Sequence, residues 1–231
     1  MKVDIIILSN AKNNELKAIT QQSINTCIES EKEIDFNIIV IEQQLGVCYN
    51  NCAVIYDSSE FNYNKFLNKG IALSSSQYIA LCNNDLVFKP NWASILIAGM
   101  QKYNLLSACP ICPNVQPHRL PLTEEVYFGY RNSHEVSGWC IMINRDILKI
   151  IGKLDEEFPF WFADNVYSEQ LKKHGINHAV FSKSVVQHLR SKTLDTLPKE
   201  EKDPITIGLK DKFIELHPDN ESSIYFKGIN K

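Results

Sequence analysis

Residues 78–92, YIALCNNDLVFKPNW, decide the fold of this 231-residue chain. The apolar run Tyr78–Cys82 is followed by the polar triplet Asn83-Asn84-Asp85 and then by a second apolar run, Leu86–Phe88. A short continuous apolar run is typical of a strand buried on both faces of a parallel sheet. The stretch therefore predicts an α/β protein in which polar side chains follow the carboxyl end of a central strand.

The residues before this stretch alternate between strand and helix patterns. β-Branched or apolar runs predict strands at 3–8, 36–41 and 53–56, and apolar residues at helical spacing predict helices at 15–30, 63–74 and 91–103. Ligands bind at the carboxyl ends of strands in open α/β sheets. Polar residues follow the carboxyl ends of three predicted strands: Ser9-Asn10, Glu42-Gln43 and the triplet. The sequence therefore predicts that these residues contact one nucleotide-like ligand.

The second half of the chain shows a less regular pattern. It predicts strands at 105–109, 136–144 (carrying Gly138 and Trp139) and 179–181, a short helix at 145–151, and a strand or loop at 182–192. A further helix is expected to begin at Asp164 or Asn165 and to stop at Gly175, and 205–216 is expected to form a short helix docked on the core.

Composition sets the broad class of the protein. The chain has 44% hydrophobic and 22% charged residues, which excludes a disordered protein. Its formal net charge of −3 excludes a basic field over the whole molecule. The N-terminus does not resemble a signal peptide, and no apolar window approaches the roughly 20 residues of a membrane span. Together with an odd number of cysteines, seven, these features predict a soluble, cytoplasmic protein with reduced thiols.

Four of the cysteines raise an alternative to reduced thiols, which is a zinc site with four thiolate ligands. Cys48, Cys52, Cys109 and Cys112 supply one C-x-x-x-C and one C-x-x-C, which is not the spacing of a zinc ribbon. Reduced loop cysteines are the expected state of these residues.

The triplet at 83–85 permits two interpretations from its residues alone. Short polar side chains often form Asx turns, in which they bond their own backbone. The functional alternative is an oxygen-ligand site for Mg²⁺ or Mn²⁺, with Asp85 as the carboxylate ligand and a diphosphate supplying further oxygens.

The stretch at 78–92 and five further segments, which follow one another in the family's order, resemble family 2 glycosyltransferases with the GT-A fold. The stretch at 78–92 is similar to their DXD segment. The others are VDIIILSN (3–10), FNIIVIEQ (36–43), the Asn-x-Gly region within 62–85, SGWCIMINRDILKIIGKLDEEFPFWFADNVYSEQLKKHGI (137–176) and VVQHL (185–189). The ordered set is more specific than any one motif.

The resemblance implies a fold and a reaction. It implies a Rossmann-like, mostly parallel sheet flanked by helices in one GT-A domain, 1–231, with a nucleotide-sugar-binding half (1–104), an acceptor-binding and catalytic half (105–192) and a tail packed on the core (193–231). The reaction would transfer a sugar from a nucleotide-diphosphate sugar, with a UDP-sugar as the expected donor, to an acceptor hydroxyl with inversion and with Mn²⁺ or Mg²⁺.

The resemblance also implies roles for individual residues. Asp85 would bind the metal, and His188 would join the metal or the diphosphate; a structural histidine is the alternative. Asp164 would be the general base, with a helix N-cap as the alternative. The remaining candidates are Ser9, Asn10, Glu42, Asn68 and Asn84 for the donor, Trp139, Trp161 and Phe162 for the acceptor or for the core, and Arg190 and Lys192 for phosphate or a solvated turn.

Three positions depart from the family pattern. Asn83 replaces the first acidic residue of DXD, so Asp85 is the only anionic ligand in the triplet. Ala163 replaces a Glu before Asp164, and Leu67 replaces an Arg before Asn68.

Two other functions compete with glycosyl transfer. A nucleotidyltransferase shares an open α/β sheet and acidic metal ligands, and a non-catalytic sugar- or nucleic-acid-binding derivative would retain the fold alone. The acceptor is left open among a glycan, a protein, a small molecule and a hydroxylated DNA base.

Overall fold

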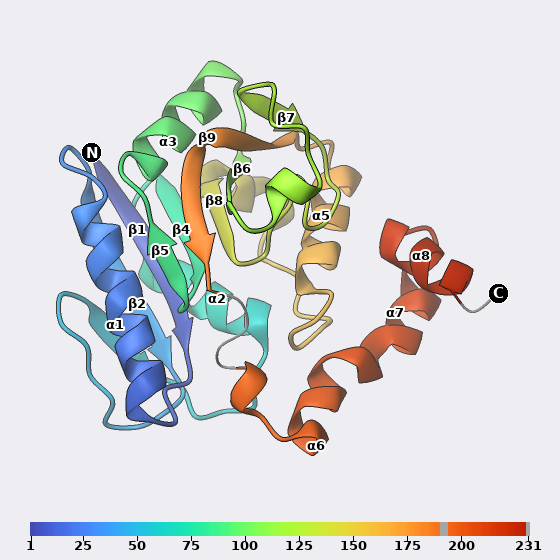
Figure 1. Cartoon of the computed structure of the whole chain (residues 1–231), viewed down its shortest axis with the longest axis horizontal. Helices are drawn as coiled ribbons and strands as arrows, with labels where there is room; N and C mark the ends of the chain where they lie inside the picture. The colour runs from blue at the N-terminus through green and yellow to red at the C-terminus, as the bar shows by residue number, and fades with distance from the viewer. Residues whose placement is uncertain (190–193, 230–231) are drawn as a thin grey trace.

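A central sheet with helices on both faces forms the body of the protein (Figure 1). The computed structural model describes residues 1–189 and 194–229. Within them the sheet has nine strands, with β7 (Val126–Phe128) attached to β9 (His178–His188) beside the main order β3-β2-β1-β4-β8-β6-β9-β5. The predicted α/β class and helix-flanked, mostly parallel sheet are confirmed.

The first half of the sheet is parallel and brings the predicted strand ends together. β1 (Lys2–Ser9) lies between β2 (Asp35–Glu42) and β4 (Tyr78–Asn83), and β3 (Ala53–Tyr56) pairs with β2. Ser9 is opposite Glu42, and Leu8 is opposite Asn83. The polar residues that leave these strands therefore share one edge of the sheet.

The second half adds strands of both directions. β6 (Ser107–Ile111) runs parallel to β9, whereas β8 (Cys140–Asn144) is antiparallel to both β4 and β6, and β5 (Leu86–Phe88) is antiparallel to β9. The strand predicted at 136–144 was wrong at its start. The amide of Cys140 donates to the carbonyl of Ser137 (3.1 Å), which closes a turn over the residues just before β8.

Helices cover the two faces of the sheet in pairs. α1 (Asn14–Glu29) and α3 (Trp92–Lys102) pack on the face that carries Ile5 and Ile7, and α2 (Tyr63–Leu73) and α5 (Ala163–Lys173) pack on the face that carries Ile6. α4 (Leu148–Ile151) is a single turn. Asparagines begin two of these helices: the Asn13 and Asn62 side chains accept from the amides three residues later, at Leu16 and Lys65.

The C-terminal tail returns to α5 through aromatic contacts. It contains α6 (Lys199–Lys202), α7 (Lys210–Leu216) and α8 (Glu221–Ile229), and Figure 1 shows it running beside the body. Phe158, Phe162 and Phe213 are buried together, and the rings of Phe162 and Phe213 stack with centroids 4.2 Å apart. The helix expected at 205–216 is shorter, because 3₁₀ turns occupy Asp203–Ile205 and Ile207–Leu209.

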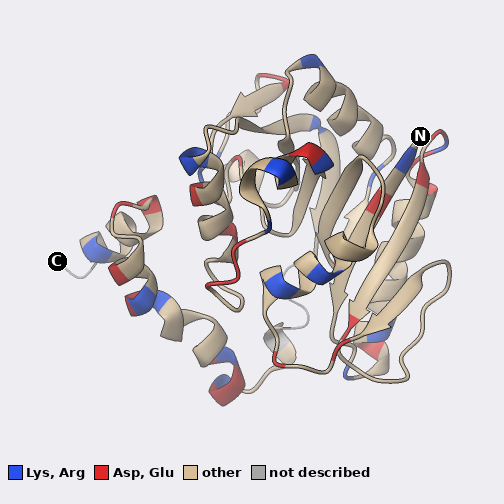
Figure 2. Ribbon diagram, turned by 180° about the vertical axis from the view of Figure 1, so that it is seen from behind, with Lys and Arg blue, Asp and Glu red and all other residues tan. Residues whose placement is uncertain are grey.

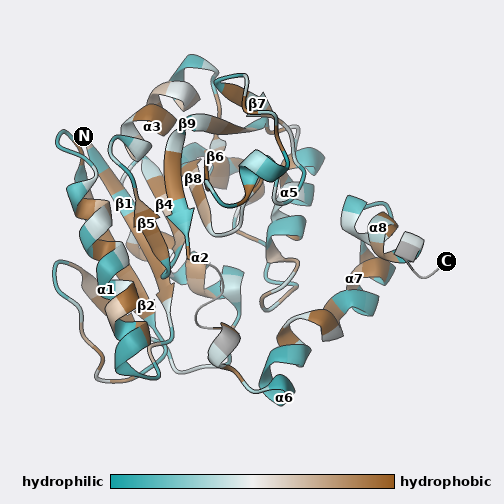
Figure 3. Ribbon diagram, viewed as in Figure 1, coloured by the Kyte–Doolittle hydropathy of each residue, from teal (hydrophilic) through white to brown (hydrophobic). Residues whose placement is uncertain are grey.

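Apolar and charged residues are distributed as a packed globular body requires. The sheet strands are the most hydrophobic elements (Figure 3), and acidic and basic residues are interspersed over helices and loops (Figure 2). Across 1–189 and 194–229, no helix combines the length and the apolar character of a membrane span.

Candidate functional site

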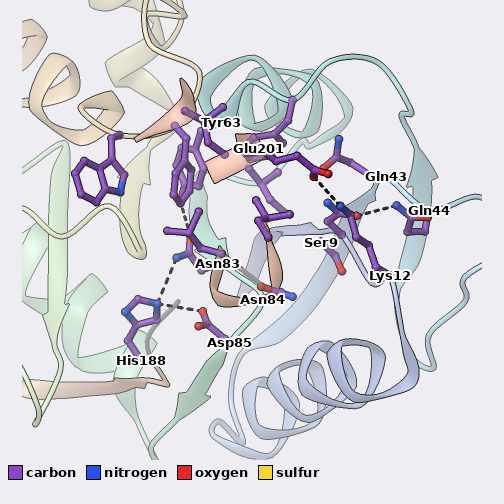
Figure 4. Close-up of a pocket in the computed structure, with 18 residues that line it drawn as sticks. Ser9, Lys12, Gln43, Gln44, Tyr63, Asn83, Asn84, Asp85, His188 and Glu201 are labelled. Carbon is purple, nitrogen blue, oxygen red and sulfur yellow. Dashed lines mark hydrogen bonds and ion pairs between the residues drawn. The ribbon is translucent and has the colours of Figure 1, made fainter. Parts of the chain in front are cut away.

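A pocket of about 440 Å³ opens at the carboxyl ends of β1, β2 and β4 (Figure 4). It gathers polar side chains from three strand ends and apolar side chains from the aromatic loop before α5 and from the C-terminal tail. The lining residues are Leu8, Ser9, Asn10, Lys12, Gln43, Gln44, Phe61, Tyr63, Asn83, Asn84, Asp85, Phe160, Trp161, His188, Leu194, Leu197, Glu201 and Ile205.

Asp85 and His188 form the most distinctive pair in the pocket. Asp85 follows β4, and His188 ends β9, where it pairs with Leu86. The Nε2 atom of His188 lies 3.1 Å from Oδ1 of Asp85 and 3.4 Å from Nδ2 of Asn83. The imidazole also stacks on Trp139, with ring centroids 5.8 Å apart. Residues separated by a hundred positions are thus fixed side by side.

The geometry of this pair fits a divalent cation. Mg²⁺ binds oxygen ligands at about 2.0–2.1 Å in an octahedron, so two adjacent ligand atoms are separated by about 3 Å. The distance of 3.1 Å between the Asp85 oxygen and the His188 nitrogen matches that separation. Within 1–189 and 194–229, no three His, Cys, Asp or Glu side chains converge. A cation at this pair would therefore need further oxygens from a ligand or water.

A buried hydrogen-bond network supports the polar wall of the pocket. The Ser9 hydroxyl lies 3.1 Å from the Thr20 hydroxyl and 3.0 Å from the Tyr49 hydroxyl. The Asn84 amide donates to Thr20 (3.0 Å), and Thr20 donates to the Leu16 carbonyl. The turn before Asp85 is thus attached to α1 and to β1.

Glu42 ends this network beneath the pocket rather than in it. Its side chain is fully buried, and Oε1 accepts from the amides of Ala11 (3.1 Å) and Gln44 (2.8 Å), whereas Oε2 accepts from Tyr49 (2.7 Å). Every oxygen is already engaged with the chain. Sequence reasoning expected Glu42 to contact the donor, but in the structure it shapes the loops that do line the pocket.

Asp164 is the second residue of α5, and its side chain lies next to Gly138. A Cβ atom added to Gly138 would lie 2.9 Å from the Cβ of Asp164, so glycine permits this approach. Burial raises the pKa of the Asp164 carboxyl, although the nearby Asn132 side chain and the amides of Asn165 and Gly138 oppose that rise. A carboxylate with a raised pKa is suited to accept a proton.

Asp164 is not the N-cap of α5. The helix begins at Ala163, its N-cap is Phe162 with φ of 71°, and no side chain caps it. The helix start expected at Asp164 or Asn165 was therefore slightly late, and the carboxylate of Asp164 accepts from the adjacent Asn165 amide instead (3.0 Å).

Asn68 is not brought to the pocket. Its Nδ2 donates to the Leu154 carbonyl and to Glu156, each at 2.9 Å, and its Oδ1 accepts from the Leu154 amide (3.0 Å). Both ends of the amide hold the loop after α4 against α2. In the structure this residue fixes that loop and does not line the pocket, and its contact with the donor stays a prediction.

The three aromatic candidates for the acceptor side separate. Trp161 is 39% exposed and lines the pocket. Trp139 is 9% exposed and packs on His188 within the core. Phe162 is buried in the cluster with Phe213, so its ring faces the tail. Only Trp161 has a free face at the pocket.

Several pocket residues were missed by sequence reasoning. Lys12 forms an ion pair with Glu201 (3.4 Å) across 189 residues, and Gln44 donates to Asn10 (2.8 Å). The Tyr63 hydroxyl lies 2.9 Å from Oδ1 of Asn83 and 2.7 Å from the Gly138 carbonyl. Gln44 directly follows the strand-end pair Glu42-Gln43, and Lys12 lies two residues after Asn10, so closeness to a strand end was the signal that could have identified both. The candidates Arg190 and Lys192 lie outside the described residues.

The cysteines are free thiols in the structure. Cys82 and Cys140 face each other across β4 and β8 with sulfurs 3.8 Å apart, Cys109 and Cys112 are buried, and Cys48 is exposed.

Three solved structures share this architecture. The mannosyltransferase PcManGT from Pyrobaculum calidifontis, in complex with GDP-Man and Mn²⁺, is 8% identical with a TM-score of 0.60, over 82% of this chain and 57% of that one. GalNAc-T7 with UDP, GalNAc and Mn²⁺ is 13% identical with a TM-score of 0.66, over 93% and 48%. S. aureus TarS 1-349 is 11% identical with a TM-score of 0.59, over 94% and 73%.

These similarities concern the fold, since all the identities are low. The chain spans less than two thirds of the length of the first two structures. Comparison with curated protein sequences gave no match.

The family model described as glycosyl transferase family 2 matches residues 2–152. That range runs from β1, through the strand end that presents Asp85, to the turn after α4. The strand ends that build the pocket therefore belong to the matched region, and the neighbouring structures share the GT-A architecture. The chain has the GT-A fold and belongs to glycosyl transferase family 2.

Proposed function

We propose that the protein transfers a sugar from a UDP-sugar to an acceptor hydroxyl, with inversion at the anomeric carbon and with a divalent cation, Mn²⁺ or Mg²⁺. The observation that carries the proposal is the Asp85–His188 pair, 3.1 Å apart at the edge of the pocket. The solved structures of PcManGT and GalNAc-T7 each contain Mn²⁺ with a nucleotide or nucleotide sugar, which supports this choice.

Residues 1–104 would bind the donor. Asp85 and His188 would hold the cation, and Lys12, which lines the same pocket on the side of Gln44 and Glu201 (Figure 4), would supply positive charge for the diphosphate. When bound, the cation would act as a Lewis acid on the leaving diphosphate. Ser9, Asn10, Gln44 and Asn84 offer the hydroxyl and amide groups for the nucleoside.

Residues 105–192 would bind the acceptor and supply the base. Asp164 would take the proton from the acceptor hydroxyl while that oxygen forms its bond to the anomeric carbon. The bond between the anomeric carbon and the phosphate oxygen breaks at the same time, and its electron pair leaves with UDP. Trp161 presents an exposed ring at the pocket, where it would pack against a sugar.

A donor panel tests this function. The full chain is incubated with Mn²⁺ and, separately, UDP-, GDP-, CMP- and dTDP-sugars, and the released nucleotide is measured. Slow hydrolysis of a UDP-sugar, absent in Asp85→Asn and retained in Asp35→Asn, is the expected result. Asp35 is a matched control because it is exposed at the opposite end of β2. Release of pyrophosphate from a nucleoside triphosphate would instead identify a nucleotidyltransferase. Binding of a nucleotide sugar without its hydrolysis or transfer would identify a non-catalytic derivative.

A further inference from the structure

A second pocket, of about 410 Å³, shares no residue with the first. It lies between the segment 119–134, α5 and α8, which stands beside α5 in Figure 1. Its lining combines basic, aromatic and amide side chains. The residues are Arg119, Tyr130, Asn132, His134, Lys172, Asn220, Glu221, Ser222, Tyr225 and Phe226.

This second pocket begins next to Asp164. Asn132 lines it, and the Asn132 side chain also faces the Asp164 carboxyl and lowers its pKa, while the buried Nδ2 of Asn132 has no hydrogen-bond partner among the described residues. The opposite wall is attached at the neighbouring residue: Nδ2 of Asn165 donates to Ser222 (2.8 Å) and to Asn220 (3.3 Å). A ligand in this pocket would therefore lie one side chain away from the proposed base.

The charges that line the second pocket favour an anion. Within the described residues, the Arg119 side chain has no hydrogen bond or ion pair, and Lys172 has only a 3.5 Å contact with Glu169 and a distant approach to the Tyr130 ring. Glu169 is also engaged by Asn220 (2.7 Å). Glu221 is the one carboxylate in the lining, against two permanent cations. The lining is thus net positive in a chain whose net charge is −3.

The aromatic residues of the second pocket add flat faces. The Tyr130 hydroxyl is bonded to the Ile176 carbonyl (3.0 Å), which fixes that ring, and Tyr225 is 65% exposed. Ring faces beside cationic groups suit a pyranose that carries an acid group. His134 adds a polar edge: its Nδ1 lies 3.1 Å from the Asn132 carbonyl.

We propose that the second pocket holds the acidic end of the acceptor, a saccharide whose carboxylate or phosphate contacts Arg119 and Lys172 while a further sugar of the same molecule extends past Asn132 to Asp164. The assignment rests on the proposed glycosyl transfer. A volume of 410 Å³ is within the usual range for one small ligand. Nucleic acid is the less favoured occupant, because the formal net charge is −3 and acidic and basic residues are interspersed along the helices and loops (Figure 2).

Paired probes test the second pocket directly. NMR titrations of the full chain, with Mn²⁺ and UDP present, compare methyl glucuronide with methyl glucoside and glucose 6-phosphate with glucose. The acidic member of at least one pair should bind about fivefold or more tightly than its neutral partner. Arg119→Gln and Lys172→Gln should each reduce that preference, and the double variant should abolish it. Lys173→Gln, exposed on the same helix but outside the pocket, should retain it.

The outcomes separate this inference from the proposed function. If UDP binds and UDP-sugar is hydrolysed but acidic and neutral probes bind equally, the acceptor assignment is wrong and the function stands. If the acidic probe binds through Arg119 and Lys172 but no nucleotide binds, the pocket is a saccharide site and the transferase proposal fails. A single-stranded oligonucleotide that displaces the acidic probe with the same dependence on these two residues would overturn the saccharide assignment.

Discussion

Asp164 is held in a position where two physical effects oppose each other. Burial raises the pKa of its carboxyl, and the Asn132 side chain and the amides of Asn165 and Gly138 lower it. The net result is a rise, so the carboxylate is a stronger base than an exposed aspartate. An aspartate that only stabilised the N-terminus of the helix would do so in its ionised form, which the helix dipole favours. An environment that raises the pKa works against that role.

Replacement of Asp164 by Asn separates catalysis from structure. We expect kcat to fall by about 10² to 10⁴, because a general base contributes in this range, while UDP affinity stays close to that of the wild type. A transfer or hydrolysis assay and a UDP titration on the same preparations provide the two numbers. Near wild-type turnover would remove Asp164 as the base and direct attention to the carboxylates at 155–157.

The raised pKa of Asp164 also predicts pH dependence of rate and of stability. Activity should fall as the pH drops through a pKa above the ordinary value of 3.8, because the protonated acid cannot accept a proton. The folded state favours the protonated form, so its contribution to stability is present at low pH and is lost as the pH rises through the folded pKa. Asp164→Asn should therefore not lower the Tm at neutral pH, which calorimetry can measure.

Short helices of the C-terminal tail form one wall of the donor pocket. Leu194, Leu197, Glu201 and Ile205 line it, and the Trp161 amide donates to the Ile205 carbonyl (3.1 Å). The Lys12–Glu201 ion pair places a carboxylate where an anionic diphosphate would compete for the same lysine.

Glu201→Gln should therefore strengthen UDP binding. Both charged groups of the pair are substantially exposed, so the expected gain is modest, about two- to fivefold in affinity. Titration of UDP into the wild type, Glu201→Gln and Glu200→Gln measures the effect. Glu200 is an exposed neighbour outside the pocket, and its substitution should change nothing. Weaker UDP binding in Glu201→Gln would mean that Glu201 supports the donor site.

The sequence predicted the elements whose patterns are local. Strands β1, β2 and β4 and helices α1, α2 and α3 follow from apolar runs and periodic stripes, and their shared edge follows from the rule for parallel sheets. The Lys12–Glu201 pair joins residues 189 positions apart, and no local pattern marks it. For Phe162, sequence alone left the core and the acceptor side as alternatives, because its ring partner, Phe213, lies on the distant tail.

Glu42 and Asn68 show a second limit of sequence reasoning. Both residue types suit ligand binding, yet their polar atoms are engaged by amides of nearby loops, Glu42 by Ala11 and Gln44 and Asn68 by Leu154. Loop conformation decides this, and residue type alone does not reveal it.

His178 connects distant parts of the whole molecule. Its Nδ1 lies 2.8 Å from the Ser107 hydroxyl on β6, which in turn lies 2.6 Å from the Tyr167 hydroxyl on α5. Its Nε2 donates to the Glu135 carbonyl (3.0 Å). Burial lowers the pKa of His178 from 6.5 to about 4, so the neutral ring is the form that the fold holds.

Stability of the whole molecule should therefore depend on pH through His178. The folded pKa is below the unfolded pKa, so this contribution is complete above about pH 6.5 and is lost as the pH falls toward about 4. The loss amounts to about 3 kcal/mol in the free energy of unfolding. We expect the free energy of unfolding, measured with urea at several pH values in this window, to change less steeply with pH in His178→Gln than in the wild type. The variant His118→Gln, at an exposed histidine, should keep the wild-type pH dependence. Identical slopes in all three proteins would contradict the burial argument.

The central claim is that the sheet edge binds a nucleotide diphosphate through a cation held by Asp85 and His188. Titration calorimetry of UDP, with and without Mn²⁺, tests it most directly in the wild type, Asp85→Asn and the Asp35→Asn control. We predict Mn²⁺-dependent UDP binding in the wild type and in Asp35→Asn, and loss of the Mn²⁺ dependence in a folded Asp85→Asn protein. Equal Mn²⁺-dependent affinity in wild type and Asp85→Asn would contradict the claim.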